Sequence, residues 1–267
     1  MLQAKNWIWK THATGRLIQV RFVPRGSTYV MEIVTEVEVP DIPKAISSRI
    51  ASIDLGVNNL VALTNNIGER PIIINGKGVK SINRYYNKQR AKSQSDLMLR
   101  NKQHWSKALE VLTRKRFNRI KNFMHNTSRY IVNWCVKYNI DTIVIGKNDG
   151  WKQNVNLCKS ANQNFVGIPC EMLIQQIQYK AEEQGIKVIL TEESYTSGSS
   201  FLDGEIPCKE NYNYSRRIKR GLFQASTTLI NSDVNGSLQI MKKVFPNSFG
   251  YGIEGDLTPL VINIIKI

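Results

Sequence analysis

The 267-residue sequence predicts an α/β protein in which a mixed β-sheet is interrupted by long basic helices. Three observations predict this class. Short runs of β-branched residues alternate with segments of helical periodicity. Most of the net charge of +16 gathers in one helical segment. Two aspartates, Asp54 and Asp233, stand at the end of a predicted strand and at the start of a predicted helix.

The first 45 residues predict a small β unit. Residues 17–23 mostly alternate apolar and polar side chains, residues 24–27 hold the Pro and Gly of a turn, and residues 29–34 return. Pro40 and Pro43 then mark a linker. We therefore divide the chain into a hairpin unit, residues 1–45, and a larger domain, residues 46–267.

The larger domain begins with three predicted strands at residues 50–57, 60–65 and 71–75. A long helical stretch follows at about residues 81–138, broken near Asp96. The later elements are a strand at 142–145, a helix at 171–184, a strand at 187–191 and a helix at 231–245. This order is that of an RNase H-like fold, which places the fourth strand beside the first and the fifth beside the fourth. Their C-terminal ends should lie near Asp54.

Composition excludes several classes of protein. The longest apolar run is shorter than the 18 residues that a membrane span needs, and the first ten residues lack the core of a signal peptide. We therefore expect a cytoplasmic protein without a membrane partner; the oligomeric state stays open. The four scattered cysteines form no C-x-x-C pair, which predicts neither a zinc site nor a disulfide framework.

The excess charge lies in the predicted helical insertion, residues 77–140. Sixteen Lys or Arg stand there against two acids, a net charge of +14, which leaves +2 for the rest of the chain. Such an imbalance predicts a surface for nucleic acid, although a Lys-rich face often only aids solubility. The expected contacts are Arg114, Lys115, Arg116, Arg119 and Lys121, with a second basic cluster at Arg216, Arg217, Lys219 and Arg220. A merely solvated face is the alternative for the second cluster.

The two aspartates predict a metal site. Gly56 follows Asp54, so this carboxylate stands where a ligand can approach the backbone. Asp233 begins a helical pattern, where the helix dipole favours an acid. Carboxylates that converge from a strand and a helix suit Mg²⁺, and with a third acid they suit a two-ion site for phosphodiester cleavage. Taken singly, each aspartate is more commonly a turn residue or a helix cap.

The sequences around these aspartates, residues 54–62 and 230–238, resemble the first and third motifs of RuvC-type nuclease domains in the OrfB (TnpB-type) proteins of insertion sequences. The resemblance runs from about residue 45 to the C-terminus and includes residues 151–153, 177–181, 193–197 and 217–223. It implies a RuvC domain and an RNA-guided DNA endonuclease with Mg²⁺, two ions, as cofactor. DNA and a guide-type RNA would be its partners. The hairpin unit would be the remnant of a wedge domain, without the family's larger N-terminal recognition region.

One departure concerns the fourth strand, where the family commonly has a catalytic Glu and this sequence has Gly146. We predict that Glu193, after the neighbouring fifth strand, replaces it. Glu192 should point to the opposite face, and Asp149 and Glu171 are weaker candidates.

The predicted catalytic and metal-binding residues are thus Asp54, Glu193 and Asp233. Without a replacement acid, the chain would be a nuclease-inactive RNA- or DNA-binding protein. The absent recognition region favours a further alternative, a truncated, non-functional transposase-like fragment. The family's Cys₄ zinc ribbon has no counterpart, since Cys208 stands alone in that stretch. His125 could contact phosphate and Trp151 could stack on a base. The alternatives are helix packing or an exposed position for His125 and a loop anchor for Trp151.

Overall fold

The computed structural model describes residues 13–40, 48–148, 167–249 and 255–264. The chain divides into two compact units, Met1–Pro40 and Asp41–Ile267. The expected boundary at residue 45, Asp149 and Trp151 lie outside the described residues. No helix in these ranges combines the length and the apolar character needed to traverse a bilayer.

The first unit is an antiparallel hairpin of β1 (Arg16–Arg25) and β2 (Thr28–Glu36), which confirms the predicted hairpin and extends both strands. Cross-strand pairing places Phe22 opposite Met31 on one face and Arg21 opposite Glu32 on the other, the latter joined by a 2.6 Å ion pair. Phe22 is 68% exposed. The hairpin therefore has almost no core of its own, as expected for two strands.

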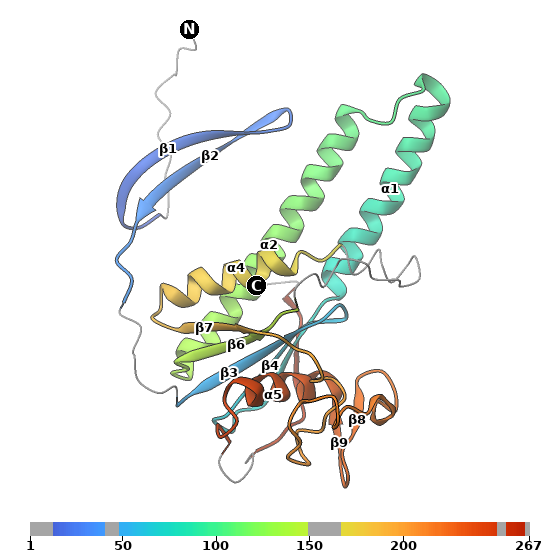
Figure 1. Ribbon diagram of the computed structural model, residues 1–267. Coiled ribbons are helices and arrows are strands. Elements are labelled where there is room, and N and C mark those ends of the chain that lie inside the picture. The colour runs from blue at the N-terminus through green and yellow to red at the C-terminus, as the bar shows by residue number, and fades with distance from the viewer. Residues whose placement is uncertain (1–12, 41–47, 149–166, 250–254, 265–267) are drawn as a thin grey trace. The chain divides into compact units, whose positions relative to one another are not determined.

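The second unit is built on a six-stranded mixed sheet of order β10-β5-β4-β3-β6-β7 (Figure 1). Its strands are β3 (Ile50–Leu55), β4 (Asn59–Asn65), β5 (Ile72–Asn75), β6 (Thr142–Gly146), β7 (Lys187–Thr191) and β10 (Leu260–Ile262). Strands β3, β4 and β5 pair antiparallel, whereas β6 pairs parallel with both β3 and β7. The fourth predicted strand (β6) was expected beside the first (β3), and the fifth (β7) beside the fourth. Both pairings are confirmed. Strand β10, parallel to β5, was not predicted because three residues show no periodicity.

Four α-helices are described: α1 (Lys77–Asn101), α2 (Lys107–Lys137), α4 (Cys170–Glu182) and α5 (Ser232–Val244). The break expected near Asp96 lies instead after Asn101, so that prediction was wrong by several residues. Lys102 adopts a left-handed conformation, φ 52°, and the Ser106 side chain accepts a hydrogen bond from the Leu109 N–H to start α2. Neither Gly nor Pro marks this turn in the sequence.

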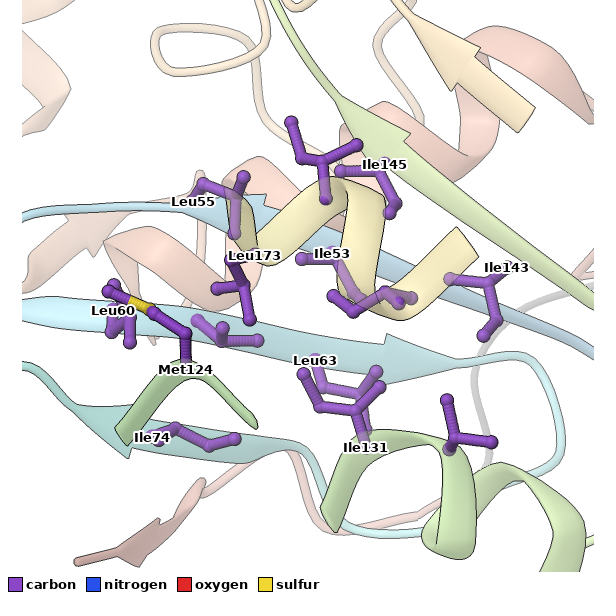
Figure 2. Packing of buried hydrophobic residues seen from close by; sticks show 14 of the residues in the cluster. Ile53, Leu55, Leu60, Leu63, Ile74, Met124, Ile131, Ile143, Ile145 and Leu173 are labelled. Atoms are coloured by element: carbon purple, nitrogen blue, oxygen red, sulfur yellow. The ribbon is translucent and has the colours of Figure 1, made fainter. Parts of the chain in front are cut away.

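The sheet separates an apolar face from a partly polar one. On β3, Ile53 and Leu55 pack with residues of α2 and α4, such as Met124 and Leu173 (Figure 2). Because strand side chains alternate, Asp54 points to the other face, which α5 covers (Figure 1). Thus the same alternation that builds the core places Asp54 toward the helix that carries Asp233.

Buried hydroxyls fix α5 on that face. Ser52 Oγ donates to the Ser237 carbonyl at 2.7 Å, and Ser237 Oγ donates to the Ser52 carbonyl at 2.9 Å. Thr64 Oγ1 lies 2.9 Å from Ser237 Oγ. Since buried polar groups require partners, these bonds specify one position of α5 against β3 and β4. The first turn of α5 is thereby held beside the end of β3.

A short antiparallel pair, β8 (Leu222–Gln224) and β9 (Leu229–Asn231), precedes α5, and the 3₁₀ turn η1 (Tyr214–Arg216) precedes β8. These elements lie between the predicted strand at 187–191 and the predicted helix at 231–245, where no element was predicted. Phe223 of β8 and Ile230 of β9 pack with Val234 and Leu238 of α5. The segment that carries the second basic cluster is therefore anchored to α5.

Candidate functional site

Asp54 is the centre of an acidic group. Burial raises the pKa of Asp54 well above its usual range, nearby Glu193 and Asp233 raise it further, and Arg217 acts in the opposite direction. The three charge effects, unlike that of burial, require neighbouring groups. Glu193, in the segment after β7, and Asp233, at the start of α5, thus lie near enough to Asp54 of β3 for their charges to act on its pKa.

Asp233 lies in the first turn of α5. Asn231 caps this helix: its Oδ1 accepts the Asp233 N–H at 2.9 Å and the Val234 N–H at 3.2 Å. The Asp233 carboxylate accepts a hydrogen bond from Asn59 Nδ2 at 2.6 Å, and Arg217 Nη2 lies 3.7 Å from it. Asn59, from the segment that contains Asp54, thus binds the aspartate of the second segment that predicted the site.

Gly236, one turn further along α5, allows the close approach of helix and strand. A Cβ atom at this position would lie 2.7 Å from Asp54 Oδ2. Gly236 was not among the predicted site residues. The available signal was a glycine inside a helix, which costs about 0.5–1 kcal/mol relative to alanine and often reports close packing.

Glu193 follows β7, and its carboxylate lies beside Gly146. Burial raises the pKa of Glu193. Asn148 holds it from two sides: Asn148 Nδ2 donates to Glu193 Oε1 at 3.2 Å, and the Glu193 N–H donates to Asn148 Oδ1 at 3.0 Å. A Cβ at Gly146 would lie 3.0 Å from Glu193 Oε2 and 2.5 Å from Ile240 Cδ1. A side chain at residue 146 would therefore compete with Glu193 for the same space.

The other candidate acids have different partners. Glu192 is exposed and accepts a 3.0 Å hydrogen bond from Lys243. Glu171 is also exposed and forms an ion pair with Lys147 at 2.9 Å. Among the described alternatives, Glu193 is therefore the one that faces Asp54.

The chemistry of this group fits a divalent cation, although its geometry is not that of a closed ligand set. Within the described ranges, no three His, Cys, Asp or Glu side chains form a ready metal-binding group. Asp233 and Glu193 turn instead toward their donors, Asn59 and Asn148. Neighbouring carboxylates repel one another, and the asparagine donors offset part of this repulsion. The carboxylate oxygens of Asp54, Glu193 and Asp233 are nevertheless the type of ligand that Mg²⁺ prefers.

A cleft of about 630 Å³ opens beside Asp233. It is lined by Gly56, Val57, Asn58, Asn59, Tyr214, Arg217, Lys219, Arg220, Gly221 and Asp233. The loop after β3 and the segment before β8 thus form its walls. The acidic Asp233 meets the basic Arg217, Lys219 and Arg220 there, and these basic side chains attract phosphate.

The second basic cluster does not act as one surface. Arg216 Nη1 bonds both carboxylate oxygens of Glu205, at 2.8 and 2.9 Å, and lies 3.7 Å from Asp203. Its side chain is only 26% exposed, so the expected phosphate contact is replaced by an internal ion pair. Arg217 faces Asp233, whereas Lys219 and Arg220 are exposed along the cleft.

The basic residues of α2 also differ in exposure. Lys115, Arg119 and Lys121 are exposed, while Arg114 is partly buried. Arg116 is held internally, because its Nε donates to Asn83 Oδ1 at 2.7 Å and its guanidinium lies 5.0 Å from the Tyr86 ring centroid. A pocket of about 180 Å³ lies between α1 and α2, lined by Ile82, Tyr85, Tyr86, Leu112, Lys115, Arg116 and Arg119.

His125 packs between α2 and α4. The buried Lys180 of α4 donates to the His125 carbonyl at 3.0 Å and to Ser128 Oγ at 2.5 Å, and its Nζ lies 3.4 Å from His125 Nδ1. Burial lowers the pKa of Lys180 to about 8. The packing interpretation of His125 therefore agrees with the structure.

Two family models match the chain. OrfB_IS605, described as a probable transposase, matches residues 32–152, and the Cas12f1-like TNB domain matches residues 171–240. The first range includes Asp54 and Gly146, and the second includes Glu193 and Asp233. No curated protein matches the chain.

The fold is similar to solved structures of Cas12f proteins. A Cas12f1–sgRNA–target DNA complex matches with a TM-score of 0.54 at 20% identity, over 83% of this chain and 54% of that one. A CRISPR–Cas12f ternary complex matches with a TM-score of 0.56 at 17% identity, over 83% of this chain and 44% of that one. This chain thus spans about half the length of those proteins, and the likeness concerns the fold.

Proposed function

Because the chain belongs to the TnpB-type family of transposon-associated proteins, we propose that it binds nucleic acid and cuts DNA in a Mg²⁺-dependent reaction directed by a guide-type RNA. The observation that carries this proposal is the convergence of Asp54, Glu193 and Asp233 beside a cleft with basic walls. We assign the sheet and α5 to a RuvC, RNase H-like domain, and the hairpin unit to a wedge-type β domain. Guide RNA and DNA as partners are consistent with the complexes named in the matched structures.

In this mechanism Asp54 is the central carboxylate, and Glu193 and Asp233 complete the site from either side. A pair of bound Mg²⁺ ions would supply the activation of water and stabilise the leaving oxygen. Asn59 and Asn148 orient the outer carboxylates through the hydrogen bonds described above. Such supporting bonds hold metal ligands in a productive direction.

The cations act on the substrate. Arg217 lines the cleft 3.7 Å from Asp233, where it offsets acidic charge and can contact a phosphate. Lys219 and Arg220 line the cleft, so we assign them to the backbone of the bound strand. The exposed residues Lys115, Arg119 and Lys121 would bind backbone along α2.

The test compares cleavage of single-stranded DNA by the wild type and by Asp54→Asn, Glu193→Gln and Glu192→Gln. We expect the first two substitutions to lower the rate by at least about 10³-fold, because metal-stabilised charge contributes several kcal/mol to the barrier. Glu192→Gln, the exposed neighbour, is the matched control and should retain the rate. Undiminished cutting by Glu193→Gln would reject its assignment.

A second function, nucleic-acid binding without cleavage, is favoured by Gly146 at the position of the family's usual acid and by the open arrangement of the three carboxylates. Its measurement is a binding assay in parallel with the cleavage assay. A wild-type protein that binds single-stranded DNA tightly and cuts none of it with Mg²⁺ would establish this second function and exclude the first.

A further inference from the structure

Tyr214 stands out among the tyrosines of the segment before β8. Its side chain is 66% exposed and lines the 630 Å³ cleft. Tyr195 and Tyr212 pack edge-to-face with ring centroids 5.9 Å apart, and Tyr212 also covers Gly198. The Tyr214 ring stacks on no other aromatic ring in the part of the chain that the structure describes. An amphipathic ring thus faces an open cleft.

Cations gather on the same cleft. Lys80, in the first turn of α1, donates a hydrogen bond from its ammonium group to Asn58 Oδ1, and Asn58 lines the cleft beside Arg220. Lys77 stands in the same helical turn as Lys80, and Arg220 lines the cleft together with Asn58, the partner of Lys80. In agreement with this placement, burial lowers the pKa of Lys80, and the charges of Arg220 and Lys77 lower it further. Across the described ranges, none of the three forms an ion pair with a carboxylate. Like charges gathered in this way attract an anion.

We propose that this cleft binds one unpaired nucleotide of a polynucleotide strand, with the base stacked on Tyr214 and an adjoining phosphate between Lys80 and Arg220. The proposal deepens the proposed function, on which its orientation toward the acids depends. The cleft volume lies within the range of about 300–1,000 Å³ that is usual for small-ligand sites.

The stacking partner determines which strand fits. In a duplex both faces of a base are covered by its neighbours, so a base can reach Tyr214 only after it has left the stack. Aromatic stacking of this kind tolerates any base, because every base has a π-face. The subsite therefore selects single-stranded over double-stranded nucleic acid without reading sequence.

The first experiment measures binding in EDTA, where no cutting occurs, by fluorescence anisotropy of a short single-stranded oligonucleotide. Tyr214→Ala should weaken binding by about 5- to 150-fold, the range that corresponds to one stacked base. Tyr214→Phe should bind as the wild type does. The matched probe is an abasic strand of equal length, whose affinity should not change with Tyr214→Ala. Equal weakening for both strands, or a Phe variant as weak as the Ala variant, would overturn the stacking role.

The second experiment tests the phosphate position by the salt dependence of binding. Lys80→Gln should lower the slope of log K against log salt by about 0.7, for the base-carrying and abasic strands alike, because one phosphate contact of a single strand is lost. Lys187→Gln is the control, since Lys187 is exposed at the start of β7, the end away from Glu193. An unchanged slope for Lys80→Gln would reject the phosphate position.

The last experiment repeats the binding measurement with a DNA strand and an RNA strand of the same sequence. A Tyr214→Ala effect on one of the two strands alone identifies which polymer enters the cleft, and a duplex of the same sequence should show no effect. Because these measurements need no cleavage, failure of the nuclease proposal leaves them intact. Loss of the stacking effect in a protein that still cuts would reject the subsite alone.

Discussion

The acidic centre at the end of β3 and the helix pair α1–α2 are built in opposite ways. At the acidic centre, Asp233 and Glu193 each have an asparagine that fixes the carboxylate. On α2, by contrast, Lys115 and Lys121 are exposed. Cleavage requires groups held to within about 0.5 Å, whereas affinity for a polyanion requires only charge near its surface. The difference indicates which substitutions should affect rate and which should affect affinity.

The second basic cluster contains both a residue held by ion pairs and a residue exposed to solvent. Arg216 is enclosed by Glu205 and Asp203, as a structural residue is, while Lys219 lies exposed along the cleft. Charge alone does not distinguish them in the sequence. Their partners do, so substitutions at Arg216 should act on stability and substitutions at Lys219 on binding.

Outside the three carboxylates themselves, the largest expected effect is at Asn148. Asn148→Ala removes both hydrogen bonds that orient Glu193, so we expect cleavage to fall by about 10- to 100-fold, the usual cost of losing a bond that supports a metal ligand. Initial rates on single-stranded DNA measure it, with Asn118→Ala on the exposed side of α2 as the control. A full rate for Asn148→Ala would show that Glu193 needs no support.

Next in size is Gly146→Ala, which inserts a methyl group against Ile240 and Glu193. Overpacking should lower the free energy of unfolding by about 1–3 kcal/mol and, by displacing Glu193, slow cleavage as well. Urea denaturation provides the first value and the cleavage assay the second. Ser81→Ala on the exposed face of α1 should change stability by less than about 0.5 kcal/mol. A Gly146→Ala variant as stable and as active as the wild type would contradict the crowding at this position.

Arg216→Ala should have a smaller effect on stability. It leaves Glu205 and Asp203 without their shared cation, and because all three side chains are partly exposed we expect a loss of about 1–2 kcal/mol rather than the 3–5 kcal/mol of a fully buried pair. Lys219→Ala should leave the unfolding free energy within about 0.5 kcal/mol and weaken DNA binding instead. The reverse pattern in denaturation and binding would end the distinction between the two residues.

The smallest single effects belong to α2. Substituting Lys115, Arg119 or Lys121 by Gln should lower the slope of log K against log salt by about 0.7–0.9 per lost phosphate contact, without loss of stability. Binding titrations at several salt concentrations measure this slope. Arg116→Gln, which removes the bond to Asn83, should instead reduce stability. Unchanged slopes for all three exposed residues would remove α2 from the binding surface.

Much of the fold followed from local patterns. The runs of β-branched residues at 50–55 and 142–145 predict strands, because strand preference depends on residues that are adjacent in the sequence. The order of the elements then predicts that these two strands are neighbours in the sheet. The turn at Lys102 was misplaced because a left-handed lysine has no sequence marker. Strands β8, β9 and β10 are too short to show a period.

The site was predictable only in part. Asp54 and Asp233 stand in recognisable frames, whereas the roles of Asn59 and Asn148 depend on contacts between distant segments. Asn59 bonds a residue 174 positions away, and Asn148 one 45 positions away. Nothing within a local window reports such a pair. Lys80 reaches the cleft in the same way, through Asn58.

The parallel ladder between β6 and β7 pairs Gly146 with Thr191, so both strands stop at one level of the sheet. A reactive group can therefore migrate from one strand to the next during evolution while its position in space barely moves. A sequence motif that requires the acid at one fixed position would classify such a protein as inactive. An acid just beyond the residue that pairs with this position on the neighbouring strand would identify such a protein. Chains with a glycine at the position of Gly146 are the first in which to look for it.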